Sequence, residues 1–297
     1  MLSLFLMLAL GFLAGKTRVL TPKDNKIISR MVNCLTNPCN VLYAALCCGH
    51  TLENGEALKL LIVAIAAYGF LVLAAQGVPW LLRVPASQKN QYKYMMVFNN
   101  CGFMGIPVVS AVFGAEAMIC VTIFIIVFYI FLYTYGLYLI RGETGGFRLR
   151  DLLTPMIVSS VLSLIFYLCR VQVGGVLAET MDMVRAVTTP CAMLVLGCAL
   201  SALDFRTIFG NWRLYVVSLL KLLVLPAVLL LLLRPVLRNP MTLDVTVCIM
   251  GMPIATNFTM LSAQYDGDQV LASSSTFITT LVSVLTIPLL IGLLQTL

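Results

Sequence analysis

Two short runs of similar sequence carry the residues that could bind a small molecule. Residues 99–108 read NNCGFMGIPV and residues 249–257 read IMGMPIATN, each within a long apolar segment. In both runs a glycine and a proline stand two residues apart, with the prolines at Pro107 and Pro253. Proline removes a helical N–H donor and clashes with the preceding turn. Each run is therefore predicted to break a membrane helix near mid-membrane.

A broken helix inside a membrane is a costly structure with a specific chemistry. Each unpaired backbone group costs several kcal/mol in hydrocarbon, so such breaks persist only when buried in protein or lining a wet cavity. The amino-terminal end of a half-helix carries about half a positive charge and unpaired N–H donors. If the two breaks cross, up to four half-helix ends point at one spot. A small carboxylate is the ligand that suits it.

Three asparagines flank the predicted breaks: Asn99, Asn100 and Asn257. A side-chain amide donates to a carboxylate and accepts from a freed backbone amide, without the desolvation cost of a buried charge. We expect Asn100 and Asn257 to contact substrate, and the alternative is that the asparagines only satisfy backbone groups of the broken turns. The predicted substrate-binding set is Asn99, Asn100, Gly102, Gly105, Thr256 and Asn257.

The glycines and prolines of the two runs have other expected roles. Gly102, Gly105 and Gly251 allow the close backbone approach of the breaks. Pro107 and Pro253 open the helices and bind nothing.

A second pair of polar sites accompanies two further prolines. Asn37 precedes Pro38 and Thr189 precedes Pro190, each near the middle of an apolar segment. A helix kink with local packing is the favoured interpretation. Lining of a substrate path by Asn37 and Thr189 is the alternative.

Lys221 is the one lysine deep inside an apolar segment, about nine residues or about 13 Å from its basic end. An unpaired ammonium at that depth is costly. It could snorkel toward the cytoplasm, pair with an acid such as Asp204, or serve as a counter-charge for an anionic substrate.

Acidic residues are missing from the middle of the apolar segments, since Glu116, Asp204, Asp244, Asp266 and Asp268 all fall at their ends or in loops. This disfavours a carboxylate-based sodium site and a buried proton relay. Proton and sodium both remain open as coupling ions, with carbonyls and hydroxyls of Thr256, Thr259 and Ser262 as alternative sodium ligands. The single histidine, His50, is expected at the surface, and neither metal nor cofactor is predicted.

The composition places the chain in a membrane. Of 297 residues, 61% are hydrophobic and only 10% charged, with a mean hydropathy of +1.01, whereas soluble domains carry roughly 25% charged residues. The net charge of +7 does not indicate a nucleic-acid partner, because the basic residues form no dense patch with interleaved aromatics. The ten cysteines are interpreted as small apolar residues.

A bilayer core takes about 20 apolar residues per crossing, which predicts ten segments. The predicted spans are 1–15, 26–48, 57–82, 91–113, 116–140, 151–170, 180–201, 212–233, 241–263 and 268–294. Most of the 19 lysines and arginines fall in loops on one side. That side is predicted to be cytoplasmic, which places both termini outside.

An internal repeat relates the two halves, because the runs described above fall in the fourth and ninth segments. The two runs lie five segments apart, and because five is odd the second half enters the membrane from the opposite side. Residues 1–140 and 151–297 are therefore predicted to be inverted five-helix repeats joined by a cytoplasmic loop, 141–150. The predicted fold is an all-α polytopic membrane protein of ten helices. Helices 4 and 9 are predicted to be broken at prolines.

The sequence resembles bacterial members of the auxin efflux carrier family, of the malate or malonate permease kind, over essentially its whole length. The matching residues include the run from Asn99 to Pro107, Asn37-Pro38-Cys39 and the stretch from Thr189-Pro190 to Gly197. An end block also matches, with Met252-Pro253, Tyr265, Asp268, residues 273–276 and Pro288.

The resemblance implies that the broken helices 4 and 9 cross at the midplane. It also implies a homodimer in which helices 1, 2, 6 and 7 form a scaffold. Helices 3–5 and 8–10 would form a transport domain that moves like an elevator. It also implies small organic anions as substrates, among them malate and malonate.

The expected function is secondary transport of a small carboxylate or dicarboxylate across a bacterial-type plasma (inner) membrane, not an enzymatic activity. Without a coupling ion, a negative interior favours export by about 2.3 kcal/mol per charge per 100 mV, so the direction stays open. Two alternatives are a membrane-embedded enzyme and a non-transporting sensor on a transporter-like fold. The first lacks a nucleophile or metal set, and the second lacks a loop long enough for an output domain.

Overall fold

The computed structural model describes residues 2–47, 52–141, 154–201, 209–265 and 267–296. His50, Asp204, Asp266 and nearly all of the predicted 141–150 loop lie outside these ranges. The described chain is nearly all helical, and its one β feature is an isolated antiparallel bridge between Asn99 and Ile254. The chain divides into two compact units, each assembled from separate stretches of sequence.

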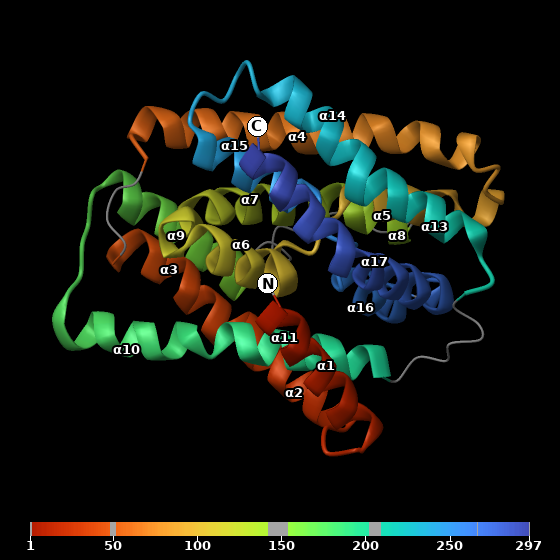
Figure 1. Ribbon diagram of the computed structural model, residues 1–297, viewed down its shortest axis with the longest axis horizontal. Coiled ribbons are helices and arrows are strands. Elements are labelled where there is room, and N and C mark those ends of the chain that lie inside the picture. Colours follow the sequence, from red (N-terminus) through yellow and green to blue (C-terminus); the bar gives the residue numbers. More distant parts are fainter. Residues whose placement is uncertain (1, 48–51, 142–153, 202–208, 266, 297) are drawn as a thin grey trace. The chain divides into compact units, whose positions relative to one another are not determined.

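Unit 1 consists of residues 1–61, 102–126 and 153–203. Its complete helical elements are α1 (Leu2–Lys16), α2 (Pro22–Met31), the π turn Val32–Thr36, α3 (Asn37–Cys47), α6 (Ile106–Phe113), α9 (Pro155–Leu168), α10 (Gly175–Ala186) and α11 (Thr188–Ser201), shown in Figure 1. This unit contains the predicted spans 1, 2, 6 and 7.

Unit 2 consists of residues 62–101, 127–152 and 204–297. Its elements include most of α4 (Asn54–Leu81), α5 (Lys89–Val97), the end of α7 (Met118–Phe131), the π turn Leu132–Gly136, α8 (Leu137–Arg141), α13 (Trp212–Leu219), the π turn Leu220–Val224, α14 (Leu225–Leu233), α15 (Pro240–Met250), α16 (Asn257–Gln264) and α17 (Gln269–Thr296). The assignment of scaffold and transport roles to sets of helices stays a prediction.

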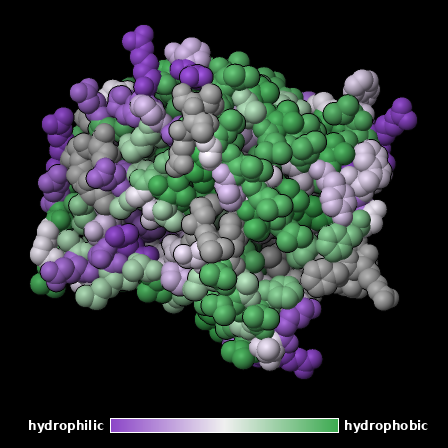
Figure 2. Space-filling model, viewed as in Figure 1, coloured by the Kyte–Doolittle hydropathy of each residue, from purple (hydrophilic) through white to green (hydrophobic). Residues whose placement is uncertain are grey.

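Five helical stretches among the described residues are long and apolar enough to cross a membrane: 55–81, 115–141, 175–199, 212–233 and 269–294. Shorter apolar helices cover 6–16, 101–113, 155–168 and 240–250. Figure 2 shows hydrophobic side chains over the visible surface of α13 and α14, where Leu231 is 73% exposed. The fold is that of a polytopic membrane protein, while the count of ten helices and the inverted repeat stay predictions.

Glycines set the packing of α1 against α11 in unit 1 (Figure 1). A Cβ atom at Gly197 would overlap the Leu8 carbonyl oxygen and lie 2.6 Å from the Phe12 nitrogen. A Cβ at Gly11 would lie 2.5 Å from the Leu194 oxygen. Small residues allow this approach in lipid, where van der Waals packing drives helix association.

Three of the π turns are each followed by a proline at the second residue beyond their end. Pro38 follows Val32–Thr36, Pro107 follows the π turn Cys101–Gly105, and Pro226 follows Leu220–Val224. A proline clashes with the carbonyl four residues before it, and in all three cases that carbonyl lies in the π turn. A π turn bonds i to i+5, so it accommodates the proline without ending the helix.

This geometry corrects one expectation about the first break. Pro107 does not break its segment, because the helix runs through it from Cys101 to Phe113. The break lies earlier, at residues 98–100, directly before the π turn. Pro253 lies in the non-helical stretch between α15 and α16, and its place at a midplane crossing stays a prediction.

Candidate functional site

Two breaks in the helices of unit 2 pair with each other. The first begins where α5 ends, with Phe98 extended at φ −94° and ψ 117°, and the helix resumes at Cys101. The second covers residues 251–256, between the end of α15 and the start of α16. The isolated bridge joins the two at Asn99 and Ile254, antiparallel. Segments far apart in the sequence are therefore held together by their backbones.

Hydrogen bonds between the breaks satisfy backbone groups that a continuous helix would satisfy itself. The Asn100 N–H donates to the Pro253 oxygen at 2.8 Å, and the Ala255 N–H donates to the Phe98 oxygen at 3.1 Å. All four residues are buried. The pairing lowers the cost of breaking two helices in an apolar environment, because several kcal/mol per unpaired group is avoided.

Side chains from α17 and α5 fix the second break in place. The Ile254 N–H donates to Thr279 Oγ1 on α17 at 3.3 Å. At the start of α16, Phe258 stacks on Tyr94 of α5, with ring centroids 4.5 Å apart and an 18° angle between the planes. Neither Thr279 nor Tyr94 belongs to the predicted site. The hydroxyl-rich run in residues 273–280 was the only sequence signal for the first of them.

Asn99 is fully buried and its side chain is bound on both sides by protein. Its Oδ1 accepts a hydrogen bond from Lys221 Nζ at 2.6 Å, and its Nδ2 donates to the Met250 sulfur at 3.5 Å. In this arrangement the Asn99 amide links Lys221 to Met250 on α15. Direct contact of Asn99 with substrate stays an untested prediction.

Lys221 lies in the π turn between α13 and α14 and is 1% exposed. Besides Asn99, its Nζ donates to the Met96 carbonyl oxygen at 3.1 Å, in the last turn of α5. The ammonium points into unit 2, so the snorkelling interpretation is wrong for this side chain. Both acceptors of Lys221 are neutral oxygens, one from a side-chain amide and one from a backbone carbonyl. Among the described residues the only salt bridge joins Arg185 and Asp182.

The remaining predicted residues of unit 2 lie at the breaks. Asn100 is buried, with 3% exposure. Asn257 is the first residue of α16 and is half-buried, and Thr256 directly precedes it. The Thr256 hydroxyl is buried and has no hydrogen-bond partner among the described residues. Asn257 and Thr256 thus lie where the amino end of a helix meets the paired breaks.

Gly251 is closely packed by side chains of two other helices of unit 2. A Cβ there would lie 2.5 Å from Leu290 Cδ2 on α17 and 3.3 Å from Pro226 Cγ on α14. The carboxyl end of α15 is therefore packed directly against these two helices.

Unit 1 contains the other predicted positions. Asn37, the first residue of α3, is 1% exposed, and neither of its amide atoms has a hydrogen-bond partner among the described residues. A Cβ at Gly102 would lie 3.8 Å from Asn37 Nδ2, so this amide faces the first turn of the 101–113 helix. Gly105 is buried in the same helix, as is Pro107.

Thr189, near the start of α11, is half-buried. Its neighbour Thr188 is fully buried, and no described residue forms a hydrogen bond with its hydroxyl. Of these two adjacent threonines, Thr188 has the more deeply buried side chain, and the role of Thr189 stays a prediction.

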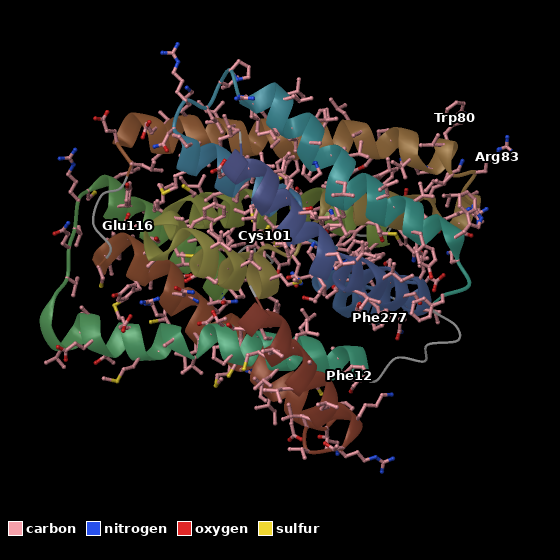
Figure 3. The ribbon with its side chains drawn as sticks, viewed as in Figure 1. Phe12, Trp80, Arg83, Cys101, Glu116 and Phe277 are labelled. Atoms are coloured by element: carbon pink, nitrogen blue, oxygen red, sulfur yellow. The ribbon has the colours of Figure 1, made fainter. Side chains whose placement is uncertain are left out.

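A separate cavity of about 650 Å³ lies at the turn between α4 and α5. Its lining includes Trp80, Arg83, Lys89 and Lys93, and Figure 3 shows Trp80 and Arg83 at the end of α4, away from Cys101. Trp80 is 83% exposed. These are surface basic residues at a helix end, so the paired breaks are the better candidate site. Within the described ranges, no three His, Cys, Asp or Glu residues come together as metal ligands.

Comparison with known proteins identifies the family. A family model described as membrane transport protein matches residues 1–149 and 144–291, which together span nearly the whole chain. No curated protein gives a significant match. The family match agrees with the long apolar helices of the structure. The chain therefore belongs to the membrane transport protein family, to which the auxin efflux carriers belong, and is a multi-pass membrane protein.

Proposed function

We propose that this protein is a secondary transporter of small organic anions, carboxylates or dicarboxylates such as malate or malonate. The observation that carries the proposal is the pairing of the breaks at Asn99 and Ile254, with one helix starting at Cys101 and another at Asn257. Helix starts provide N–H donors and a positive dipole end, both of which favour a carboxylate. The family supports a transport function in general.

The substrate carboxylate would bind at the start of α16. Asn257 offers an amide at the first helical position, and Thr256 offers a hydroxyl that no described residue satisfies. Asn100 contributes from the first break, where its backbone N–H is already bonded to Pro253. Because the backbone of the breaks is satisfied by pairing, side chains and helix-start amides supply the recognition.

Transport would proceed by an elevator-type movement, with a transport domain of helices 3–5 and 8–10 moving against a scaffold of helices 1, 2, 6 and 7. The support is that one of the two compact units contains helices 1, 2, 6 and 7, although that unit also contains residues 102–126 of helices 4 and 5. The carrier would act as a homodimer in the plasma membrane with both termini outside, as the distribution of basic loop residues predicts.

The proposal is tested by flux in proteoliposomes. Purified protein is reconstituted, and uptake and efflux of labelled malate and malonate are measured for wild type, Asn100→Ala and Asn257→Ala. Asn90→Ala, a half-buried position in α5 away from the break, is the matched control. We expect both site variants to lose at least about tenfold in flux, since a hydrogen bond to a charged group contributes about 1.5–3 kcal/mol. The control should retain wild-type flux.

Unimpaired flux in both site variants would exclude the proposed binding residues. Specific binding of malate or malonate without flux in wild type would instead favour the sensor alternative. Absence of both binding and flux across a panel of mono- and dicarboxylates would refute the proposed substrate class.

A further inference from the structure

Lys221 occupies an unusual position at the paired breaks. Its ammonium is buried and is held by two oxygens, Asn99 Oδ1 at 2.6 Å and the Met96 carbonyl at 3.1 Å. Met96 lies in the last turn of α5, at the negative end of that helix. Asn99 is the residue that bridges to Ile254. The ammonium is thus attached directly to the junction of the two breaks.

The acceptors of Lys221 are of the kind that hold a metal cation in other transporters. Where membrane helices are interrupted, unwound carbonyls and half-helix carboxyl ends coordinate the coupling sodium ion. Here the same types of oxygen surround an ammonium that belongs to the protein. An ammonium has three N–H donors, and the third has no acceptor within the described part of unit 2.

We propose that Lys221 is a resident cation of the paired breaks, bound by oxygens that would otherwise hold a coupling metal ion, and that the transported anion binds without co-bound sodium. The identity of the transported anion in this proposal rests on the proposed function. The charge of Lys221 is not cancelled locally, because both acceptors are neutral. A protonated Lys221 would therefore give the site one net positive charge before substrate arrives.

The first test measures the cation site without any substrate. Lys221→Ala removes three methylenes and the ammonium, the atoms that n-propylammonium would replace. Melting temperatures are measured in chloride salts of n-propylammonium, sodium and N-methyl-D-glucamine for wild type, Lys221→Ala and Lys59→Ala, whose lysine is exposed on α4. We expect n-propylammonium to raise the melting temperature of Lys221→Ala by about 2 °C or more relative to N-methyl-D-glucamine. Wild type and Lys59→Ala should not respond.

The second test separates charge from packing. Asn99→Asp keeps the shape of the side chain and its hydrogen bond to Lys221, but it places a negative charge beside the ammonium. We expect malonate affinity to fall at least about tenfold, with no loss of melting temperature. Lys221→Met, which keeps the length of the chain without its charge, should lose affinity similarly. Wild-type malonate binding should be the same in sodium and in N-methyl-D-glucamine.

The outcomes are distinguishable from those of the proposed function. Wild type that binds no carboxylate would refute the proposed function, while the n-propylammonium comparison would still decide the resident cation. If n-propylammonium raised the melting temperatures of Lys221→Ala and Lys59→Ala equally, the resident-cation proposal would be overturned. Sodium-dependent malonate binding in wild type would also overturn it. Should Lys221→Ala fail to fold, unchanged malonate affinity in Asn99→Asp would overturn the proposal and a tenfold loss would support it.

Discussion

The hydrogen bond between Lys221 and Asn99 is the most exacting interaction at the paired breaks. Its donor is charged, its length is 2.6 Å, and both residues are at most 1% exposed. Asn99→Leu keeps most of the side-chain volume and removes one of the two acceptors of a buried ammonium. Hydrogen bonds to charged groups contribute about 1.5–3 kcal/mol, and a buried charged donor left without one of its acceptors adds a desolvation cost. We expect a loss of about 3 kcal/mol for Asn99→Leu.

The reverse substitution has a smaller expected cost. Lys221→Met leaves Asn99 Oδ1 and the Met96 carbonyl without their donor, but it leaves no buried charge. An unsatisfied neutral acceptor costs about 1–3 kcal/mol. In the double variant both polar partners are replaced by apolar side chains, which is often nearly neutral. The double variant should therefore be destabilised by about 1.5–3 kcal/mol less than the sum of the two single variants.

The measurement is a double-mutant cycle of unfolding free energies in detergent. About 3 kcal/mol corresponds to a melting temperature lowered by roughly 6–12 °C in a protein of this general size. Thermal unfolding of the four proteins at one detergent concentration gives the coupling directly. Additive costs, with the double variant as unstable as the sum predicts, would refute a direct interaction between the two side chains.

Two further predictions concern packing in unit 1. Gly197→Ala should force α1 away from α11, since its Cβ would lie 2.6 Å from the Phe12 nitrogen. The expected loss in the free energy of unfolding is about 1–3 kcal/mol. In the same thermal unfolding measurement, the control Gly69→Ala, with open space around it, should be neutral or stabilising. Tyr167→Phe should cost about 1–3 kcal/mol, because the buried Tyr167 hydroxyl accepts from the Leu52 N–H at 2.6 Å and donates to the Leu52 oxygen at 2.7 Å. Unchanged melting temperatures for Gly197→Ala or Tyr167→Phe would contradict these contacts.

The sequence was sufficient to locate the interrupted segments but not the first interruption itself. Proline predicts a break through its clash with the carbonyl four residues earlier, and Pro253 follows that rule. At Pro107 the carbonyl in question, that of Phe103, lies in a π turn, where the rule does not apply. A π turn leaves no distinct pattern of hydrophobic residues, so the shift of the break to residues 98–100 could not be read from composition or spacing.

The partners of the polar residues were equally invisible in the sequence. Lys221 was identifiable as a lysine at an unexpected depth, yet its acceptors, Met96 and Asn99, come from a segment more than a hundred residues earlier. Depth alone could not distinguish a snorkelling lysine from one held inward. In the same way, proximity to Pro190 does not specify which of Thr188 and Thr189 is the more buried.

The pairing of the breaks has a consequence for the carrier without substrate. If the freed backbone groups were satisfied only by a bound anion, the empty site would pay several kcal/mol for each of them. Instead, Asn100 and Ala255 donate to oxygens of the opposite break, and Lys221 meets the carboxyl end of α5. The broken helices are thus stable without a ligand. In the proposed function, recognition would then depend on groups that the pairing does not use, such as Thr256 and Asn257 at the start of α16.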